Sequence, residues 1–417
     1  MTKRMICLLI LILFNGEMDS FSTIGTDGAP FTLQAFIAMT AGASTVNGYA
    51  FMSGGFSLPG STSSLLWHSY FPCQGPITLN GATLTLNRGD FVLFGNATLI
   101  NGGIFVCNGF SVQFPHDNSP FSPGSTPSTF NGGNVSFNSP VALSTTLTFQ
   151  GTSILNGNGN IITFASAAAI SVASGGSLLI QNATLQGISA SQLACQDNTG
   201  VLSLQNVTIV QDGDFTFTLG IMNILNDVEF TGSSVFAFRS TNSLNINSYS
   251  TLMFDAGSTF SYDTTNASLL KFSDVTAQLF LNGATLAATG TGINLTKGTL
   301  NVDSNSFFAS TGTLGVTIGS CVSANDLQVN MFNNSQLTVN QGLLNYKNVN
   351  AASFNMFNSF AQLSMGAGTT LNVYRSLNGL GSVIFGNNTT LGTSPGASLL
   401  ISSLQQGTIS FSTLPSC

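Results

Sequence analysis

The sequence predicts an all-β fold in which short strands coil into a parallel β-helix (solenoid) behind an irregular N-terminal cap. Short runs rich in Val, Ile, Leu, Thr and Phe recur along the chain, and each ends at Asn or Gly. One strand-and-turn phrase repeats, and residues 141–394 contain no proline. Only 6% of the 417 residues are charged, which excludes long salt-bridged helices and coiled coils.

The chain begins with the pattern of an export signal. Lys3 and Arg4 precede an unbroken apolar run over residues 5–14. This run is too short to span a bilayer core, which takes about 20 residues. We therefore expect a signal peptide over residues 1–22, cut near Ser22, and a protein that is secreted or held at the cell surface. An uncleaved N-terminal anchor is the alternative.

Residues 23–75 differ in composition from the rest of the chain. Aromatic residues, including Phe31, Phe51 and Trp67, alternate here with many Gly and Ser residues. Every solenoid ends in exposed strand edges, and a cap is the usual protection. This segment is predicted to form an N-terminal cap or irregular first turns.

Residues 76–417 carry the repeated phrase, in which Asn or Gly precedes a small residue, Thr and an aliphatic residue. Two copies start at Asn182 and Asn206, and their spacing suits one β-helix turn of roughly 20–30 residues. Stacked turns lie about 4.8 Å apart, so like side chains form inner ladders. Asn and Gly tolerate left-handed backbone angles and therefore suit the corners. We expect roughly 14–18 turns.

The placement of proline and charge supports a continuous sheet. Proline cannot donate a ladder hydrogen bond, and like charges stacked in neighbouring strands repel each other. Residues 118–196 and 376–417 contain no Asp, Glu, Lys or Arg. The proline-rich segment 115–127 predicts an exposed loop on the body, with a linker between two parts as the alternative.

The predicted mature chain keeps five widely spaced cysteines and shows no C-x-x-C pattern. Cys73 and Cys107 are the pair closest in sequence and are a candidate disulfide, since export permits one. The alternative is that the cysteines are small buried apolar residues. The net charge of −7 argues against a nucleic-acid partner.

Candidate chemistry is sparse. Asp212 and Asp214 flank Gly213 and form the closest acidic pair, a weak candidate for a catalytic site. Paired carboxylates can bind Ca²⁺ or act as acid and base on a glycosidic bond, whereas a polar turn is the simpler interpretation. Lys271 and Lys297 are expected to be isolated. The sequence predicts no cofactor, no metal site and no catalytic motif.

Asparagine acceptors for glycosylation are frequent. Nine N-x-S/T patterns occur, although Asn, Ser and Thr are abundant enough to produce many of them by composition. Several of them fall inside the repeated phrase, where corner geometry explains the Asn. The acceptors are Asn96, Asn134, Asn182, Asn206, Asn266, Asn294, Asn333, Asn387 and Asn388.

The phrases ILNGNGNIITF (residues 154–164) and SGGSLLIQNATLQGI (residues 174–188) resemble exported right-handed β-helix proteins. That group includes pectin-lyase-like folds, autotransporter passengers and polymorphic outer-membrane proteins. Gly102-Gly103-Ile104 is similar to a tetrad motif of the last family. The resemblance implies a single-stranded, right-handed parallel β-helix. It carries over no catalytic residue, because no enzyme motif matches.

These observations predict a non-enzymatic, exported β-solenoid that acts as a structural or adhesive element at a cell surface or in the extracellular matrix. Expected partners are glycans or other cell-surface proteins, with peripheral or no membrane contact and with self-association favoured by low charge. One alternative is a carbohydrate-active β-helix enzyme, such as a polysaccharide lyase or hydrolase. Another is a passenger or effector that is exported with a separate membrane barrel.

Overall fold

The all-β prediction is confirmed. In the computed structural model, parallel strands stack as a β-solenoid of about 13 turns, with 57% of residues in strands and 2% in helices. The structure describes residues 21–24, 30–33, 37–38, 43–52, 56–58, 64–69, 77–86, 91–92, 98–114, 121–122, 124–332, 334–378, 381–400, 403–406 and 408–417. The expected signal peptide lies outside these residues except for its last two positions.

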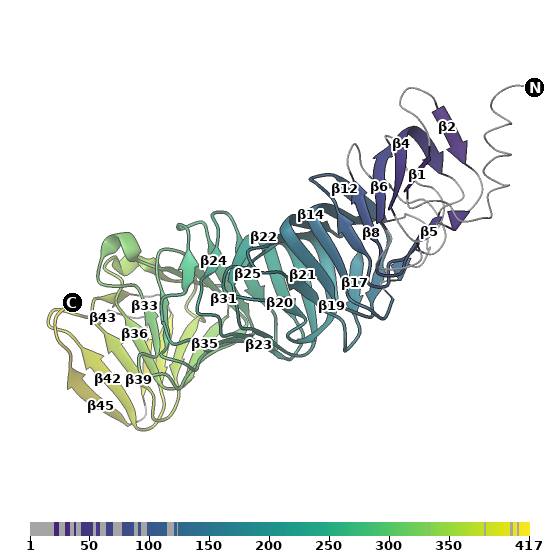
Figure 1. Cartoon of the computed structure of the whole chain (residues 1–417). Coiled ribbons are helices and arrows are strands. Elements are labelled where there is room, and N and C mark those ends of the chain that lie inside the picture. The colour runs from purple at the N-terminus through teal and green to yellow at the C-terminus, as the bar shows by residue number, and fades with distance from the viewer. Residues whose placement is uncertain are drawn as a thin grey trace, which may run out of the picture. The chain divides into compact units, whose positions relative to one another are not determined.

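The chain divides into two compact units, residues 1–171 and residues 172–417, with β18 (Ile170–Val172) at the boundary. The strands of the first unit are shown in purple and blue in Figure 1. They are β1 (Phe21–Ile24), β2 (Pro30–Leu33), β3 (Ile37–Ala38), β4 (Ala43–Met52), β5 (Phe56–Leu58), β6 (Ser64–Ser69), β7 (Ile77–Leu79), β8 (Thr83–Leu86), β9 (Phe91–Val92), β10 (Thr98–Leu99), β11 (Ile104–Val106), β12 (Ser111–Phe114), β13 (Phe121–Ser122), β14 (Ser128–Phe137), β15 (Val141–Leu143), β16 (Leu147–Asn156) and β17 (Ile161–Phe164).

Strand pairing in the first unit is parallel from its first described strand. β4 pairs with β1 and β6, and β6 pairs with β8. Parallel pairing therefore extends into the segment for which a cap or irregular first turns is predicted. Farther along, β11, β14 and β16 align Phe105, Phe130 and Phe149. Their rings stack with centroids 4.9 and 5.5 Å apart, which is the inner ladder expected of a solenoid.

The proline-rich segment is described only in part. Residues 115–120 and residue 123 lie outside the described residues, whereas β13 and residues 124–127 lie within them. Ser125, Thr126 and Pro127 are exposed just before β14.

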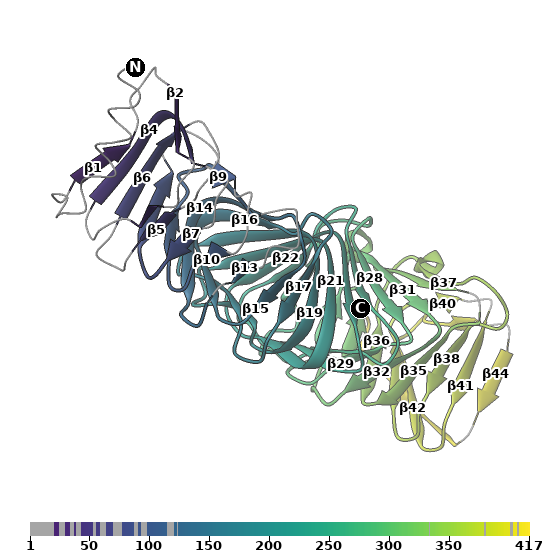
Figure 2. The ribbon, with the colours of Figure 1, turned by 90° about the vertical axis from the view of Figure 1, so that its right-hand side faces the viewer.

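In the second unit, three strand ladders follow one another around each turn (Figure 2). Three long strands bend through more than one ladder: β19 (Ser177–Ala190), β21 (Val201–Phe217) and β22 (Ile221–Thr231). The short strand β20 (Leu193–Cys195) lies between β19 and β21 in the sequence. The first ladder continues through β25 (Thr251–Phe254), β28 (Gln278–Asn282), β31 (Thr299–Asp303), β34 (Gln328–Met331) and β37 (Phe354–Met356).

The later strands of the second ladder appear in Figure 2 as neighbouring arrows in sequence order. It contains β23 (Val235–Phe238), β26 (Thr259–Tyr262), β29 (Thr285–Ala288), β32 (Asn305–Ser310), β35 (Gln336–Gln341), β38 (Gln362–Met365), β41 (Ser382–Phe385) and β44 (Ser403–Gln406).

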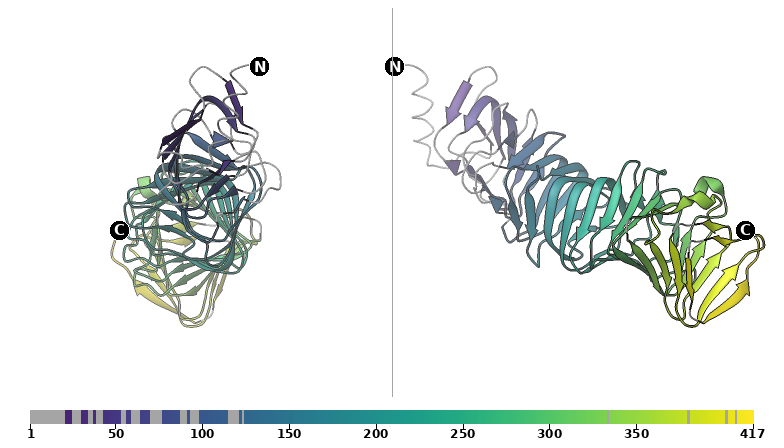
Figure 3. Two further views of the ribbon diagram at one scale, coloured as in Figure 1. Left: turned by 45° about the vertical axis from the view of Figure 1, so that its right-hand side comes forward. Right: turned by 180° about the vertical axis from the view of Figure 1, so that it is seen from behind.

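The third ladder ends in the yellow strands of Figure 1, and Figure 3 gives the view from behind. It contains the pair β24 (Leu244–Ile246) and β27 (Leu270–Phe272), followed by a separate six-stranded sheet. The strands of that sheet are β30 (Ile293–Leu295), β33 (Val316–Ile318), β36 (Leu343–Tyr346), β39 (Thr370–Val373), β42 (Thr389–Thr393) and β45 (Ile409–Thr413). The remaining elements are the pair β40 (Leu377–Asn378) and β43 (Leu399–Leu400) and the 3₁₀ turns η1 (Ser323–Asn325) and η2 (Ala351–Ser353).

The solenoid has about 13 turns, so the estimate of 14–18 turns was too high. Partners on adjacent turns show the length of a turn directly. The hydrogen-bonded pairs Asn226–Ser250, Asp255–Asn282 and Asn301–Asn330 lie 24, 27 and 29 positions apart in sequence. The last of these turns includes η1. Irregular corner segments make some turns longer without adding a strand to any ladder.

The corner role predicted for asparagine is confirmed. Asn182 and Asn206 have left-handed φ angles of 51° and 52°, and the Asn206 Nδ2 donates to the Asn182 Oδ1 at 3.1 Å. Asparagines at the same corner of successive turns thus satisfy each other's side-chain hydrogen bonding.

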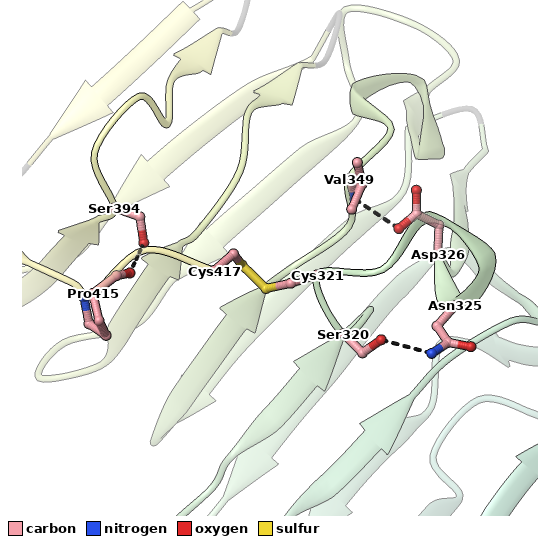
Figure 4. The surroundings of a disulfide bond; sticks show 8 residues. All are labelled: Ser320, Cys321, Asn325, Asp326, Val349, Ser394, Pro415 and Cys417. Carbon is pink, nitrogen blue, oxygen red and sulfur yellow. Dashed lines mark hydrogen bonds between the residues drawn. A yellow bond between two sulfur atoms is a disulfide. The ribbon is translucent and has the colours of Figure 1, made fainter.

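The cysteine pairing differs from the candidate pair. Cys107 is a free, buried thiol, as is Cys195, so the alternative of small buried residues is correct for both; Cys73 lies outside the described residues. A disulfide instead joins Cys321 to the last residue, Cys417 (Figure 4). The two cysteines are 96 positions apart, and only the stacking of the intervening turns brings their Cα atoms to 5.7 Å.

Candidate functional site

The weak candidates Asp212 and Asp214 lie at an exposed corner of β21. The Asp214 Oδ1 accepts a hydrogen bond from the Val235 amide at 3.0 Å, and the Gln211 Nε2 donates to the Val235 carbonyl at 3.1 Å. These bonds hold the start of β23 against the preceding turn. A groove crosses the outer side of the first ladder, and neither Asp212 nor Asp214 lines it.

That groove has a volume of about 800 Å³ and runs across the outer side of the first ladder. It lies in the second unit and crosses β21, β22, β25, β28 and β31. We call it the first-ladder groove. Its lining residues are Asn206, Val207, Thr208, Asp227, Val228, Glu229, Thr251, Met253, Gln278, Phe280, Asn301, Asp303 and Phe332.

Acidic side chains gather at this groove. Asp227 and Glu229 come from β22, and Asp303 comes from the end of β31. Burial raises the pKa of Glu229, and the charge and hydrogen bonding of the neighbouring Asp255 raise it further. The Thr208 hydroxyl, which donates to the Glu229 Oε2 at 3.4 Å, opposes this shift. The groove therefore holds a carboxyl group that resists ionisation.

A row of amides continues from the groove along the ladder. The Asn301 Nδ2 donates to the Gln278 Oε1 at 2.7 Å, and the Asn330 Nδ2 donates to the Asn301 Oδ1 at 3.0 Å. The Asn355 Nδ2 in turn donates to the Asn330 Oδ1 at 3.1 Å. Each amide is oriented by its neighbours, and an amide has further donor and acceptor capacity for a ligand.

Aromatic rings occupy the same surface. Phe280 and Phe332 both line the groove, with ring centroids 6.5 Å apart. Phe332 stacks on Phe357 at 5.2 Å, and Phe357 is 54% exposed. Apolar rings beside oriented amides and carboxyls give the groove both an apolar and a hydrogen-bonding surface.

Sequence reasoning singled out Asp212 and Asp214 and missed the groove, with its carboxyls Asp227 and Glu229. The alternation in QLFL carried a signal, because Leu279 and Leu281 are buried and Phe280 must then point outward. Phe332 follows its strand by one residue and had no such signal.

Replacing Glu229 with Gln should stabilise the fold at neutral pH. Because the folded-state pKa is raised, the folded state holds the Glu229 proton more tightly than the unfolded chain does. This favourable contribution is lost as the pH rises above about 4.3, the unfolded value, and through the folded pKa. We expect E229Q to raise the denaturation midpoint at pH 7 and to change it less at pH 4. D227N, on the same strand, is the control; a lower E229Q midpoint at pH 7 would contradict this account.

Comparison with family models, with curated proteins and with solved structures found no match to this chain. Within the described residues, no helix has the length and apolarity needed to cross a membrane. No group of three or more His, Cys, Asp or Glu side chains is arranged to hold a metal ion in that same part of the chain.

Proposed function

We propose that the chain is an exported, non-enzymatic β-solenoid that acts as a structural or adhesive element by binding a glycan along its first-ladder groove. The observation that supports this most is the combination of Phe280 and Phe332 with the amide row from Gln278 to Asn355. A sugar ring has an apolar C–H face and a rim of hydroxyls. Phenylalanine rings complement the face, and amides and carboxylates complement the rim.

The charge of the groove narrows the type of glycan. Asp227, Glu229 and Asp303 line it, whereas no Lys or Arg residue does among the residues that the structure describes. A negatively charged polymer would be repelled, so the preferred ligand is a neutral or amino-substituted sugar chain. The strands that form the groove are spaced about 4.8 Å apart, which favours an extended polymer over a single sugar.

Removing both rings should abolish most of the binding. We expect the F280A/F332A double variant to bind immobilised neutral polysaccharides about tenfold more weakly than the parent chain, because aromatic anchors carry much of the energy of a binding site. F411A removes a Phe side chain that is 77% exposed on the third ladder and serves as the matched control. Equal affinities of all three chains, or no binding to any neutral polysaccharide, would overturn the groove assignment.

A carbohydrate-active enzyme is the second candidate, and the raised pKa of Glu229 favours it. A carboxyl whose pKa is raised by burial is suited to donate its proton to a glycosidic oxygen, with Asp227 and Asp303 as the other carboxylates of the groove. Release of new reducing ends from a bound polysaccharide, abolished by E229Q while binding remains, would establish the enzyme. Its absence with intact binding would favour the non-enzymatic proposal.

Export is tested separately. The signal pattern predicts that the mature protein lacks about its first 22 residues and is found in the medium or at the cell surface. N-terminal sequencing of the chain recovered from the source cell would establish this. A full-length chain in the cytoplasm would contradict it.

A further inference from the structure

Of the five Lys and Arg residues that the structure describes, four lie at one corner of the second unit. Among the residues that the structure describes, Arg239 lies at the end of a second-ladder strand, and the other Lys and Arg residues lie on or follow strands of the third ladder. We call these other residues the cationic row. They are Lys271 in β27, Lys297 after β30, Lys347 after β36 and Arg375 after β39.

Hydrogen bonds between adjacent turns place Lys271 and Lys297 of the cationic row side by side. The Asn294 Nδ2 donates to the Ser268 Oγ at 3.0 Å, which sets Lys297 beside Lys271 on the next turn. Successive turns lie about 4.8 Å apart, and the charges therefore follow the direction in which the turns stack.

Two turns farther on, the pairing of Leu295 with Ile318 and of Ile318 with Tyr346 brings Lys347 to the position of Thr296, one residue before Lys297. Tyr346 pairs with Val373, so Lys347 aligns with Tyr374 and Arg375 follows directly. The Lys347 Nζ lies 4.6 Å from the centroid of the Tyr374 ring, a cation–π contact that orients the ammonium group and leaves its charge in place.

A depression of about 480 Å³ joins three of these cations. Lys271, Lys297 and Lys347 line it together, although sequence reasoning expected the first two to be isolated. Turn lengths bring residues far apart in sequence to one corner. Ser320 and Asn325 line the turn between Lys297 and Lys347, with the Asn325 Nδ2 donating to the Ser320 Oγ at 3.0 Å (Figure 4).

The lysines of the depression are not neutralised by a carboxylate. Within the described part of the chain, the ion pair joins Arg239 to Asp263 at 2.8 Å, away from the row. Two other carboxylates, Asp274 and Asp326, belong to segments that follow β27 and η1. Both accept hydrogen bonds from other donors, which are Ser248 and Thr276 for Asp274 and the amides of Val349 and Asn350 for Asp326.

Lys297 also occupies an unfavourable backbone conformation. Its φ angle of +72° lies in the left-handed region, where glycine and asparagine are favoured. Among the described residues with positive φ, Lys297 is the one with a charged side chain, and many of the others are Asn or Gly. Strain that is kept at a charged, exposed position suggests a use for that charge.

We propose that the cationic row binds the anionic groups of a linear acidic polysaccharide that lies along this corner. The row is narrow and extended, which suits one chain carrying carboxylate or sulfate groups at intervals. Ser320, Asn325 and Asn294 supply hydrogen-bonding groups for sugar hydroxyls. This site is separate from the first-ladder groove, whose carboxylates select against the same ligand.

The test compares polygalacturonate, dextran sulfate and neutral dextran as ligands of the full chain. We expect both acidic polymers to bind, with an affinity that falls as salt rises, and neutral dextran not to bind at the row. The K271Q/K297Q/K347Q triple variant should bind the acidic polymers at least about tenfold more weakly and with a shallower salt dependence. Tighter binding of one acidic polymer identifies carboxylate or sulfate as the preferred group.

Two control variants separate this site from the groove and from a general effect of charge. R239Q removes a unit of positive charge away from the row and should leave the affinity within about twofold. F280A/F332A should retain acidic-polymer binding, so failure of the groove proposal does not affect this one. Equal losses in R239Q and the triple variant, no binding of either acidic polymer at low salt, or tighter binding of a single-stranded oligonucleotide would overturn the proposal.

A variant that does not weaken the fold gives an independent check. K297G places glycine at a left-handed position, and its melting temperature should be equal to or above that of the parent chain. Its affinity for the acidic polymers should nevertheless fall. A K297G chain with unchanged affinity would show that Lys297 does not contribute to the site.

Discussion

Replacing Phe236 with alanine should destabilise the second unit by about 3–5 kcal/mol. Phe236 is fully buried, and its ring stacks with four others in its own turn and the two neighbouring turns. The centroid distances are 4.5 Å to Phe230, 5.2 Å to Phe215, 5.6 Å to Phe260 and 6.2 Å to Phe254. Truncation leaves a cavity. The neighbouring rings cannot move far enough to fill it, because ladder pairing fixes the strand that carries each ring.

The measurement is chemical denaturation followed by far-ultraviolet circular dichroism. Because each turn contacts only its neighbours, hydrogen exchange should show the largest loss of protection around β22, β23, β25 and β26. F411A removes an exposed ring, and its stability should change by less than about 0.5 kcal/mol. If F236A had the same stability as F411A, the stacked aromatic interior would be contradicted.

Breaking the disulfide with C417S should cost about 2–5 kcal/mol of stability, concentrated in the last turns. The bond closes a separation of 96 residues, and a long loop gives a cross-link its largest effect on the entropy of the unfolded chain. It also ties the chain terminus across β36, β39 and β42 in the third ladder. The same terminus is also held by the pairing of β45 with β42 and by the Ser394 hydroxyl, which donates to the Pro415 carbonyl at 2.6 Å.

Hydrogen exchange at single-peptide resolution would measure this effect. We expect faster exchange in β39, β42 and β45 of C417S and of the reduced parent chain, and unchanged exchange in β21 and β22. C195A, which removes a free buried thiol, is a control that leaves the disulfide in place. Uniform acceleration over the whole second unit, or none at all, would contradict a role of the bond that is local to the last turns.

Local patterns in the sequence were sufficient to predict the strands. Three runs of the strand-forming composition are QLFL (residues 278–281), VTI (residues 316–318) and SLLI (residues 177–180), and they lie in β28, β33 and β19. The corner asparagines Asn182 and Asn206 were also identified. These features depend on alternation and on backbone preference within a few residues, which a single sequence contains.

The sites depend on register, and register was not predictable. The cationic row requires Lys271, Lys297 and Lys347 to fall at the same corner, although their separations in sequence differ. The length of each turn sets that alignment, and it varies from one turn to the next because the irregular corners differ in length. No composition rule fixes such lengths. The same reason explains why the disulfide between Cys321 and Cys417 was missed.

The central claim is that successive turns lie in parallel register, each covering the apolar interior of the next. Spin labels at Asn223 and Asn245, outward-facing partners on adjacent turns, test it directly in solution. In a background with the free cysteines replaced, the account predicts strong dipolar broadening from labels closer than about 15 Å, since the turns are about 4.8 Å apart. Sharp spectra equal to the sum of the two singly labelled chains would contradict the solenoid.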